Sequence, residues 1–138
     1  MILLDTSGLL SALDASQRWH AKAAASLTSV TPPRLVSPFV LAELDYLLGD
    51  RVGEHARLAL LDEVQRGVYQ LAPMLNGDVG QARRVIEGHA DLRISLADAS
   101  IVVLAERHRT ETVLTLDERH FRVLSAGGKP FRLLPADA

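Results

Sequence analysis

The sequence predicts an α/β fold in which helices cover both faces of a parallel sheet. Short apolar runs of strand length alternate with longer segments of helical character along the chain, a rhythm typical of βαβ units. Short Pro/Gly clusters mark the turns, and no internal repeat, low-complexity tract or long linker interrupts the alternation. We therefore expect a single domain over residues 1–138.

The first part of the chain predicts two strands with a helical region between them. Residues 2–4 are wholly apolar and form the first strand. A helical region begins at residues 7–13 and resumes through the alanine-rich segment 19–27, and the Pro-Pro pair at 32–33 ends it. Residues 35–36 then form a brief second strand.

The middle of the chain predicts two helices and a strand. Ser37 suits the N-cap of a helix, and Pro38 suits its first position, where a missing N–H costs nothing. This helix runs toward Gly49 and is apolar nearly all round, which predicts that it is buried. A second helix over residues 54–65 leads to a strand over residues 68–71.

The last part continues the alternation. We expect helices over residues 76–88 and 95–108, the second of them largely buried. A strand over residues 113–116, a short helix over 118–124 and a final strand over 131–134 follow. The pattern therefore contains enough parallel strands for a sheet covered by helices.

Composition excludes several classes of protein. The 138 residues include no cysteine, which excludes disulfides, thiolate zinc sites and cysteine nucleophiles. The opening residues have no basic region of a signal peptide, and no apolar stretch reaches membrane-spanning length, so we expect a soluble, cytoplasmic protein. The formal net charge is −2, with 15 basic and 17 acidic residues, so any contact with nucleic acid must be local.

Four acidic residues predict a divalent-metal site. Asp5 and Asp117 each follow a predicted strand, and ligands of open parallel sheets bind beyond the carboxyl ends of the strands. Glu43 lies within the apolar helix, where a carboxylate is costly unless it is paired or bound to metal, whereas Asp45 faces elsewhere. Asp98 lies in the first turn of another helix. Mg²⁺ and Mn²⁺ are the hard cations that such oxygen ligands suit.

Simpler roles remain open for these acids. Asp5 and Asp117 could each cap the helix that follows, and Asp98 could form a capping box with Ser95. A capping role is compatible with a metal site, because an acid in the first turn also points toward the strand ends. The five histidines show no paired ligand spacing, so each is interpreted as a surface or locally hydrogen-bonded residue.

Four stretches in order carry a family resemblance: residues 2–7, 37–47, 96–100 and 114–121. On these stretches the chain resembles a PIN-domain ribonuclease, and more closely a VapC-type toxin of bacterial toxin–antitoxin pairs. The resemblance implies a three-layer α/β/α sandwich with a central parallel sheet.

The resemblance also implies a set of site residues, with Asp5, Glu43, Asp98 and Asp117 as its acidic quartet. Glu118 sits beside Asp117, so the fourth acid stays open. The expected supporting residues are Thr6 or Ser7 for the first aspartate and Thr115 near the fourth.

The implied activity is a Mg²⁺-dependent endoribonuclease, with Mn²⁺ able to substitute. We expect Asp5 and Asp98 to be direct ligands, with Glu43 and Asp117 as second-site ligands or orienters of water; the number of metal ions stays open. Expected partners are RNA, a small antitoxin and a second copy of the chain. Candidate RNA contacts, each of which could instead be a surface ion pair, are Arg51, Arg93 and Arg119.

The sequence argues against two other functions and leaves a third open. A phosphoacceptor domain needs a paired acid and a late lysine, but Lys22 and Lys129 are the only lysines. A haloacid-type phosphatase needs Asp-x-Asp after the first strand, where this chain has residues 5–7, Asp-Thr-Ser. The remaining alternative is a catalytically inactive PIN-fold module for protein interaction, whose signature would be a broken quartet.

Overall fold

A central sheet of five parallel strands organises the molecule. The computed structural model describes residues 1–138. The strands follow the order β3-β2-β1-β4-β7, and every neighbouring pair is parallel. They are β1 (Ile2–Leu4), β2 (Arg34–Val36), β3 (Gln70–Leu71), β4 (Thr112–Leu114) and β7 (Arg132–Leu134). The predicted α/β class with a parallel sheet is confirmed.

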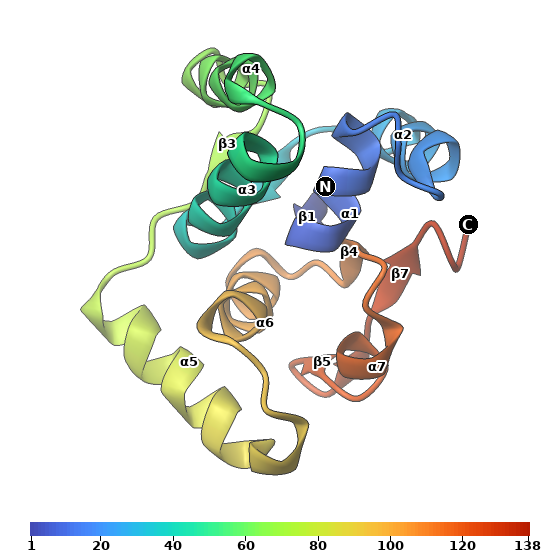
Figure 1. Cartoon of the computed structure of the whole chain (residues 1–138). Coiled ribbons are helices and arrows are strands. Elements are labelled where there is room, and N and C mark those ends of the chain that lie inside the picture. The colour runs from blue at the N-terminus through green and yellow to red at the C-terminus, as the bar shows by residue number, and fades with distance from the viewer.

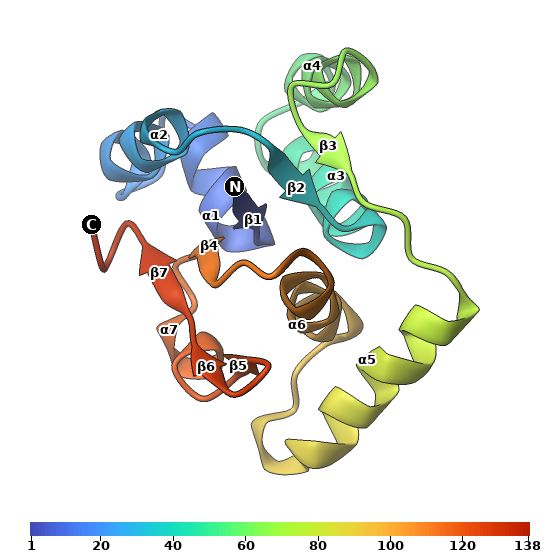
Figure 2. The same ribbon diagram turned by 180° about the vertical axis from the view of Figure 1, so that it is seen from behind.

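Seven α-helices flank this sheet, as Figures 1 and 2 show from opposite sides. They are α1 (Thr6–Leu13), α2 (His20–Ser29), α3 (Pro38–Arg51), α4 (Glu54–Gln65), α5 (Asn76–Gly88), α6 (Leu96–His108) and α7 (Glu118–Phe121). A 3₁₀ turn (Ala90–Leu92) precedes α6. None of these helices has the length and apolar character that crossing a bilayer requires.

Several predicted boundaries differ from the structure. The strand expected at 68–71 is confined to β3, and the one expected at 113–116 ends at Leu114. Helix α7 ends at Phe121 rather than at residue 124. The chain then forms a small antiparallel hairpin of β5 (Ser125–Ala126) and β6 (Lys129–Pro130), which was not predicted. Its strands have only two residues each, too few to show an alternating pattern.

Helix α6 is the central helix of the core, whereas α3 is not. In α6 the run from Ala99 to Ala105 is completely buried, as expected. Helix α3 buries only one face, formed by Val40, Leu44 and Leu48, while Tyr46 is 70% exposed. The prediction that this helix is buried all round was therefore wrong, because apolar residues on a solvent face are tolerated.

Close packing of α1 against β4 fixes the position of the first strand's end. A Cβ atom at Gly8 would overlap the carbonyl oxygen of Leu114, so only glycine allows this approach. The backbone N–H of Asp5 donates to the same carbonyl at 3.0 Å. The residues that follow β1 and β4 are thus held side by side.

Candidate active site

Asp5 is anchored where strands β1 and β4 end. Leu4 pairs with Leu114 in the sheet, so Asp5 and Thr115 leave it together. The Thr115 hydroxyl donates to Asp5 Oδ2 at 2.6 Å, and the Ser7 hydroxyl donates to the same oxygen at 3.0 Å. Two hydroxyl groups therefore fix the orientation of one carboxylate.

Burial makes the Asp5 carboxylate unusually basic. Only 5% of the residue is exposed. Removal from water is the main cause that raises the pKa of Asp5 from 3.8 to about 6. The hydrogen bond from Thr115 opposes this shift, and the neighbouring charge of Asp98 contributes to it. A cation next to this carboxylate would relieve an unfavourable negative charge.

Asp98 is both a helix cap and a member of the site. Ser95 and Asp98 form a capping box at the start of α6, with Ser95 Oγ accepting from Asp98 N at 3.1 Å and Asp98 Oδ2 accepting from Ser95 N at 3.3 Å. Burial raises the pKa of Asp98, and the cap opposes that shift. The capping role thus coexists with a place in the acidic cluster.

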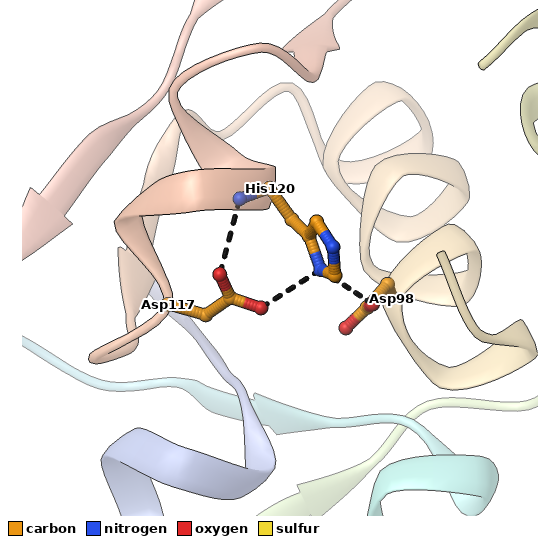
Figure 3. A group of neighbouring side chains, drawn as sticks. All are labelled: Asp98, Asp117 and His120. Atoms are coloured by element: carbon orange, nitrogen blue, oxygen red, sulfur yellow. Dashed lines mark hydrogen bonds and ion pairs between the residues drawn. The ribbon is translucent and has the colours of Figure 1, made fainter. Parts of the chain in front are cut away.

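Asp117 and Asp98 lie on either side of His120, as Figure 3 shows. Asp117 Oδ1 accepts from His120 N at 3.0 Å and so caps α7. His120 Nδ1 lies 2.9 Å from Asp117 Oδ2 and 3.4 Å from Asp98 Oδ2. This buried nitrogen nevertheless makes no well-aligned hydrogen bond. One ligand atom from each of the three residues lies within 4.8 Å of the others.

His120 is the site residue that sequence reasoning missed. The expectation of a surface or locally bonded histidine holds for His20 and His89, whose Nδ1 atoms lie 2.9 Å from the carbonyls of Ser11 and Val85. It fails for His120. The available signal was its position in the first turn of the helix that Asp117 was expected to cap.

Glu43 reaches the cluster from α3. Its Oε1 accepts from the Thr6 hydroxyl at 3.3 Å. Partial burial raises the pKa of Glu43, the Thr6 hydrogen bond opposes the shift, and Asp98 contributes in the same direction as burial. Asp45, on the same helix, instead pairs with Arg57 at 2.6 Å. Of these two acids on α3, Glu43 is therefore the one that interacts electrostatically with the acidic cluster.

One open cavity of about 300 Å³ brings the four predicted acids together. It is lined by Asp5, Glu43, Asp98 and Asp117. Thr6, Ser7 and His120 also contribute to its wall. Glu118 does not line this cavity and pairs with Arg122 at 2.8 Å. The structure thus places Asp117, rather than Glu118, beside the other acids.

The three candidate arginines are placed differently. Arg51, at the end of α3, lines the cavity, whereas Arg93 and Arg119 do not. None of the three forms an ion pair, so the alternative of surface ion pairs is wrong for all of them. Arg51 is the arginine best placed to meet an anion at the acidic site.

The residues present fit a hard divalent cation. Carboxylate oxygens are the preferred ligands of Mg²⁺ and Mn²⁺, and an imidazole nitrogen also suits Mn²⁺ better than it suits Mg²⁺. A bound cation would offset the unfavourable charges that raise the pKa values of Asp5 and Asp98, and it would give a partner to His120 Nδ1, which makes no well-aligned hydrogen bond. The tightest ligand group is Asp98, Asp117 and His120, with Asp5 outside it.

Comparisons with known proteins find a family model and a relative that match most of the chain. A family model described as the PIN domain matches residues 2–126. Ribonuclease VapC26 of Mycobacterium tuberculosis is 44% identical over 135 residues, which are 97% of this chain and 100% of the relative.

Two solved structures share the fold. The crystal structure of VapC20 of M. tuberculosis, described as a sarcin-ricin loop cleaving toxin, superposes with a TM-score of 0.79 at 23% identity, covering 85% of this chain and 90% of that one. FitAcB from Neisseria gonorrhoeae superposes with a TM-score of 0.58 at 22% identity, covering 86% and 88%. At these identities the likeness concerns the fold alone, and it agrees with the expected three-layer sandwich.

Proposed function

Because this chain belongs to the PIN domain family, we propose that it is an endoribonuclease that hydrolyses RNA phosphodiester bonds as the toxin of a toxin–antitoxin pair. The observation that carries the proposal is the convergence of Asp5, Glu43, Asp98 and Asp117 on one open cavity. The full-length alignment with a ribonuclease supports the same reaction class.

We propose that Asp5, Asp98 and Asp117 hold Mg²⁺, with Mn²⁺ as a substitute and His120 as a further donor. A bound divalent cation activates water and stabilises charge on the leaving oxygen. Thr115 and Ser7 keep the Asp5 carboxylate in one orientation, and the capping box does the same for Asp98. These constraints hold the oxygens in place before substrate arrives.

Glu43 is suited to proton transfer. Its carboxylate lines the cavity, and its raised pKa makes it a stronger base than an ordinary glutamate. The Thr6 hydroxyl orients one of its oxygens. We assign to Glu43 the acceptance of a proton from the attacking water, and to Arg51 a contact with a substrate phosphate.

Purified protein provides the direct test. It should cut RNA in Mg²⁺ or Mn²⁺ and stop in excess EDTA. Asp5→Asn should lower cleavage by at least about 100-fold, because it removes a carboxylate charge from the site. Asp62→Asn is the matched control, since Asp62 is exposed on α4 and pairs only with Arg66. Equal cleavage in EDTA, or equal loss in both variants, would refute the assignment.

The toxin role implies an antitoxin partner in the same cytoplasm. A carboxylate cluster open to solvent is a natural target for an inserted arginine, whose guanidinium binds carboxylates in a bidentate manner. Expression of the chain alone should arrest growth, and co-expression of the adjacent reading frame should restore it. We also propose that the chain forms a homodimer, which a sedimentation measurement checks.

The competing function is a catalytically inactive module of the same fold. Its signature would be a broken acidic quartet, whereas here the four acids line one cavity. If wild-type protein and Asp5→Asn are equally harmless at high expression and neither cuts RNA, the inactive module replaces the toxin.

A further inference from the structure

A second cavity, of about 320 Å³, adjoins the acidic site. Thr115, Leu116 and Glu118, which surround Asp117 in the sequence, line it together with Trp19 and Lys22. Thr115 is also the residue whose hydroxyl holds Asp5 at 2.6 Å. The same short segment therefore borders both cavities, and a polymer bound at the acids has the second cavity as its neighbour.

Trp19 gives this cavity an aromatic surface. It is the only tryptophan in the chain and is 41% exposed, although large aromatic side chains normally contribute to the core. Arg18 Cζ lies 5.4 Å and Lys22 Nζ lies 5.1 Å from the centre of its ring. The ring thus carries two cations within the range of cation–π contact.

The charge of these two cations is available to an anion. Neither Arg18 nor Lys22 pairs with a carboxylate, unlike Arg122, which binds both Glu118 and Asp137. Glu118 is the one acid in the wall of the cavity, and Arg122 compensates its charge at 2.8 Å. A phosphate near Lys22 therefore meets little repulsion.

An exposed aromatic ring with unpaired cations is an arrangement that binds single-stranded nucleic acid. Arg18 and Lys22 both lie over the Trp19 ring, so a base that stacks on the ring displaces at least one of these flexible side chains, and the displaced cation then contacts the backbone. A cavity of about 320 Å³ is near the lower limit of small-ligand clefts, roughly 300–1,000 Å³, which suits one base rather than a base pair.

We propose that Trp19, Arg18 and Lys22 form a nucleobase subsite, in which Trp19 stacks on an unpaired base next to the cleaved phosphodiester and the two cations hold adjacent phosphates. This inference rests on the proposed ribonuclease function. In this proposal the second cavity binds single-stranded RNA, and a protein partner is the alternative occupant. Trp19 contacts the substrate but not the reacting atoms.

Because Trp19 is the only tryptophan, its fluorescence reports on this subsite without any cleavage. The Asp5→Asn protein should be titrated with a short single-stranded oligoribonucleotide in Mg²⁺. Stacking should quench the emission. In a series of oligonucleotides with one abasic position each, quenching should be lost at one position and retained at the others. Uniform quenching, or none, overturns the proposal.

Cleavage kinetics provide the second test. Trp19→Ala should lower kcat/KM for a short unpaired substrate roughly 5- to 150-fold, mainly through KM, and Trp19→Phe should restore most of it. Tyr46→Ala, which removes another exposed aromatic residue, should have no effect. Lys22→Gln should raise KM more than Lys129→Gln does. The second variant is the matched control, because Lys22 and Lys129 are the only lysines and each substitution removes one positive charge.

The two tests separate this inference from the proposed function. If wild-type protein cuts RNA and Trp19→Ala cuts it equally well, the subsite is wrong and the ribonuclease stands. If wild-type protein does not cut RNA, the fluorescence titration decides the subsite alone. If Trp19→Ala changes only the capture of a co-expressed partner protein, the surface is a protein interface and the inference is overturned.

Discussion

At the scale of single residues, Asp98 combines a helix-capping role with a place in the acidic cluster. Its Oδ2 accepts the Ser95 N–H of the capping box and also faces His120. Asp98→Asn keeps an oxygen able to cap α6 but removes the charge. We expect cleavage to fall at least about 100-fold, with a melting temperature in chelator that is unchanged or raised, because the raised pKa shows that this charge is unfavourable without a cation.

Thermal unfolding and a cleavage assay on the same Asp98→Asn preparation check this prediction. A lower melting temperature with normal cleavage would mean that Asp98 is a cap and nothing more.

A separate prediction concerns His120, because its Nδ1 faces two carboxylates without a well-aligned hydrogen bond. Replacing it by alanine should weaken Mn²⁺ binding roughly 10- to 100-fold, whether the ring contacts the ion or only orients its ligands. Calorimetric titration of Mn²⁺ measures the effect. His55→Ala is the control, since His55 is exposed on α4. Equal affinities in the two variants would remove His120 from the site.

At the scale of elements, the packing of α1 on β4 positions Asp5. A side chain at residue 8 would overlap the Leu114 carbonyl. Gly8→Ala should therefore cost about 1–3 kcal/mol or more, a fall of roughly 4–12 °C in Tm, and should lower activity by displacing Asp5.

Gly80→Ala in α5 is the matched control for this substitution. The only atom near its new Cβ would be Arg84 Nη1 at 4.0 Å, so the helix should gain about 0.5–1 kcal/mol. Thermal unfolding of both variants checks the pair. Equal changes in Tm would show that the approach of α1 to β4 is not tight.

Elements with strong local signals were predictable from the sequence. The expected bounds 54–65 and 76–88 are those of α4 and α5. Ser37 and Pro38 begin α3 as expected, with Ser37 Oγ accepting from Phe39 N at 3.2 Å. A local cap marks the start of α3, whereas α4 has no side-chain cap and was predictable from helical periodicity.

Features set by distant contacts were not predictable in the same way. The proximity of His120 to Asp98 depends on how α7 packs relative to α6, which no short stretch of the sequence can indicate. The exposure of Tyr46 depends on which face of α3 meets the core. The meeting of Asp5 and Asp117 was predictable, because parallel strands in one sheet end at the same edge.

At the scale of the whole molecule, the buried acids link stability to pH. Asp5 has a folded pKa of about 6 against 3.8 for its ordinary value, so the folded state binds more protons between these pH values. Stability therefore falls as pH rises from about 4 to about 6, by roughly 3 kcal/mol for this group. The raised pKa values of Asp98 and Glu43 act in the same direction.

Urea unfolding at pH 5 and pH 7 checks this linkage. In chelator, the wild-type chain should be less stable at pH 7, and Mg²⁺ should reduce the difference by binding only the folded protein. Asp5→Asn should reduce it without Mg²⁺. The lowered pKa of Asp137, to about 2, acts below this window and does not interfere. Greater stability at pH 7 in chelator would contradict the assignment.

The hydrogen bond between Thr115 and Asp5 joins residues 110 positions apart. During translation, Asp5 leaves the ribosome early, but its partners on β4 and α7 are still unmade. Strand β4 lies between β1 and β7 in the sheet, so the site closes only when the last part of the chain has emerged. A chain that ends before β4 therefore lacks the assembled acidic cavity, whether it is still being synthesised or is the truncated product of an interrupted message.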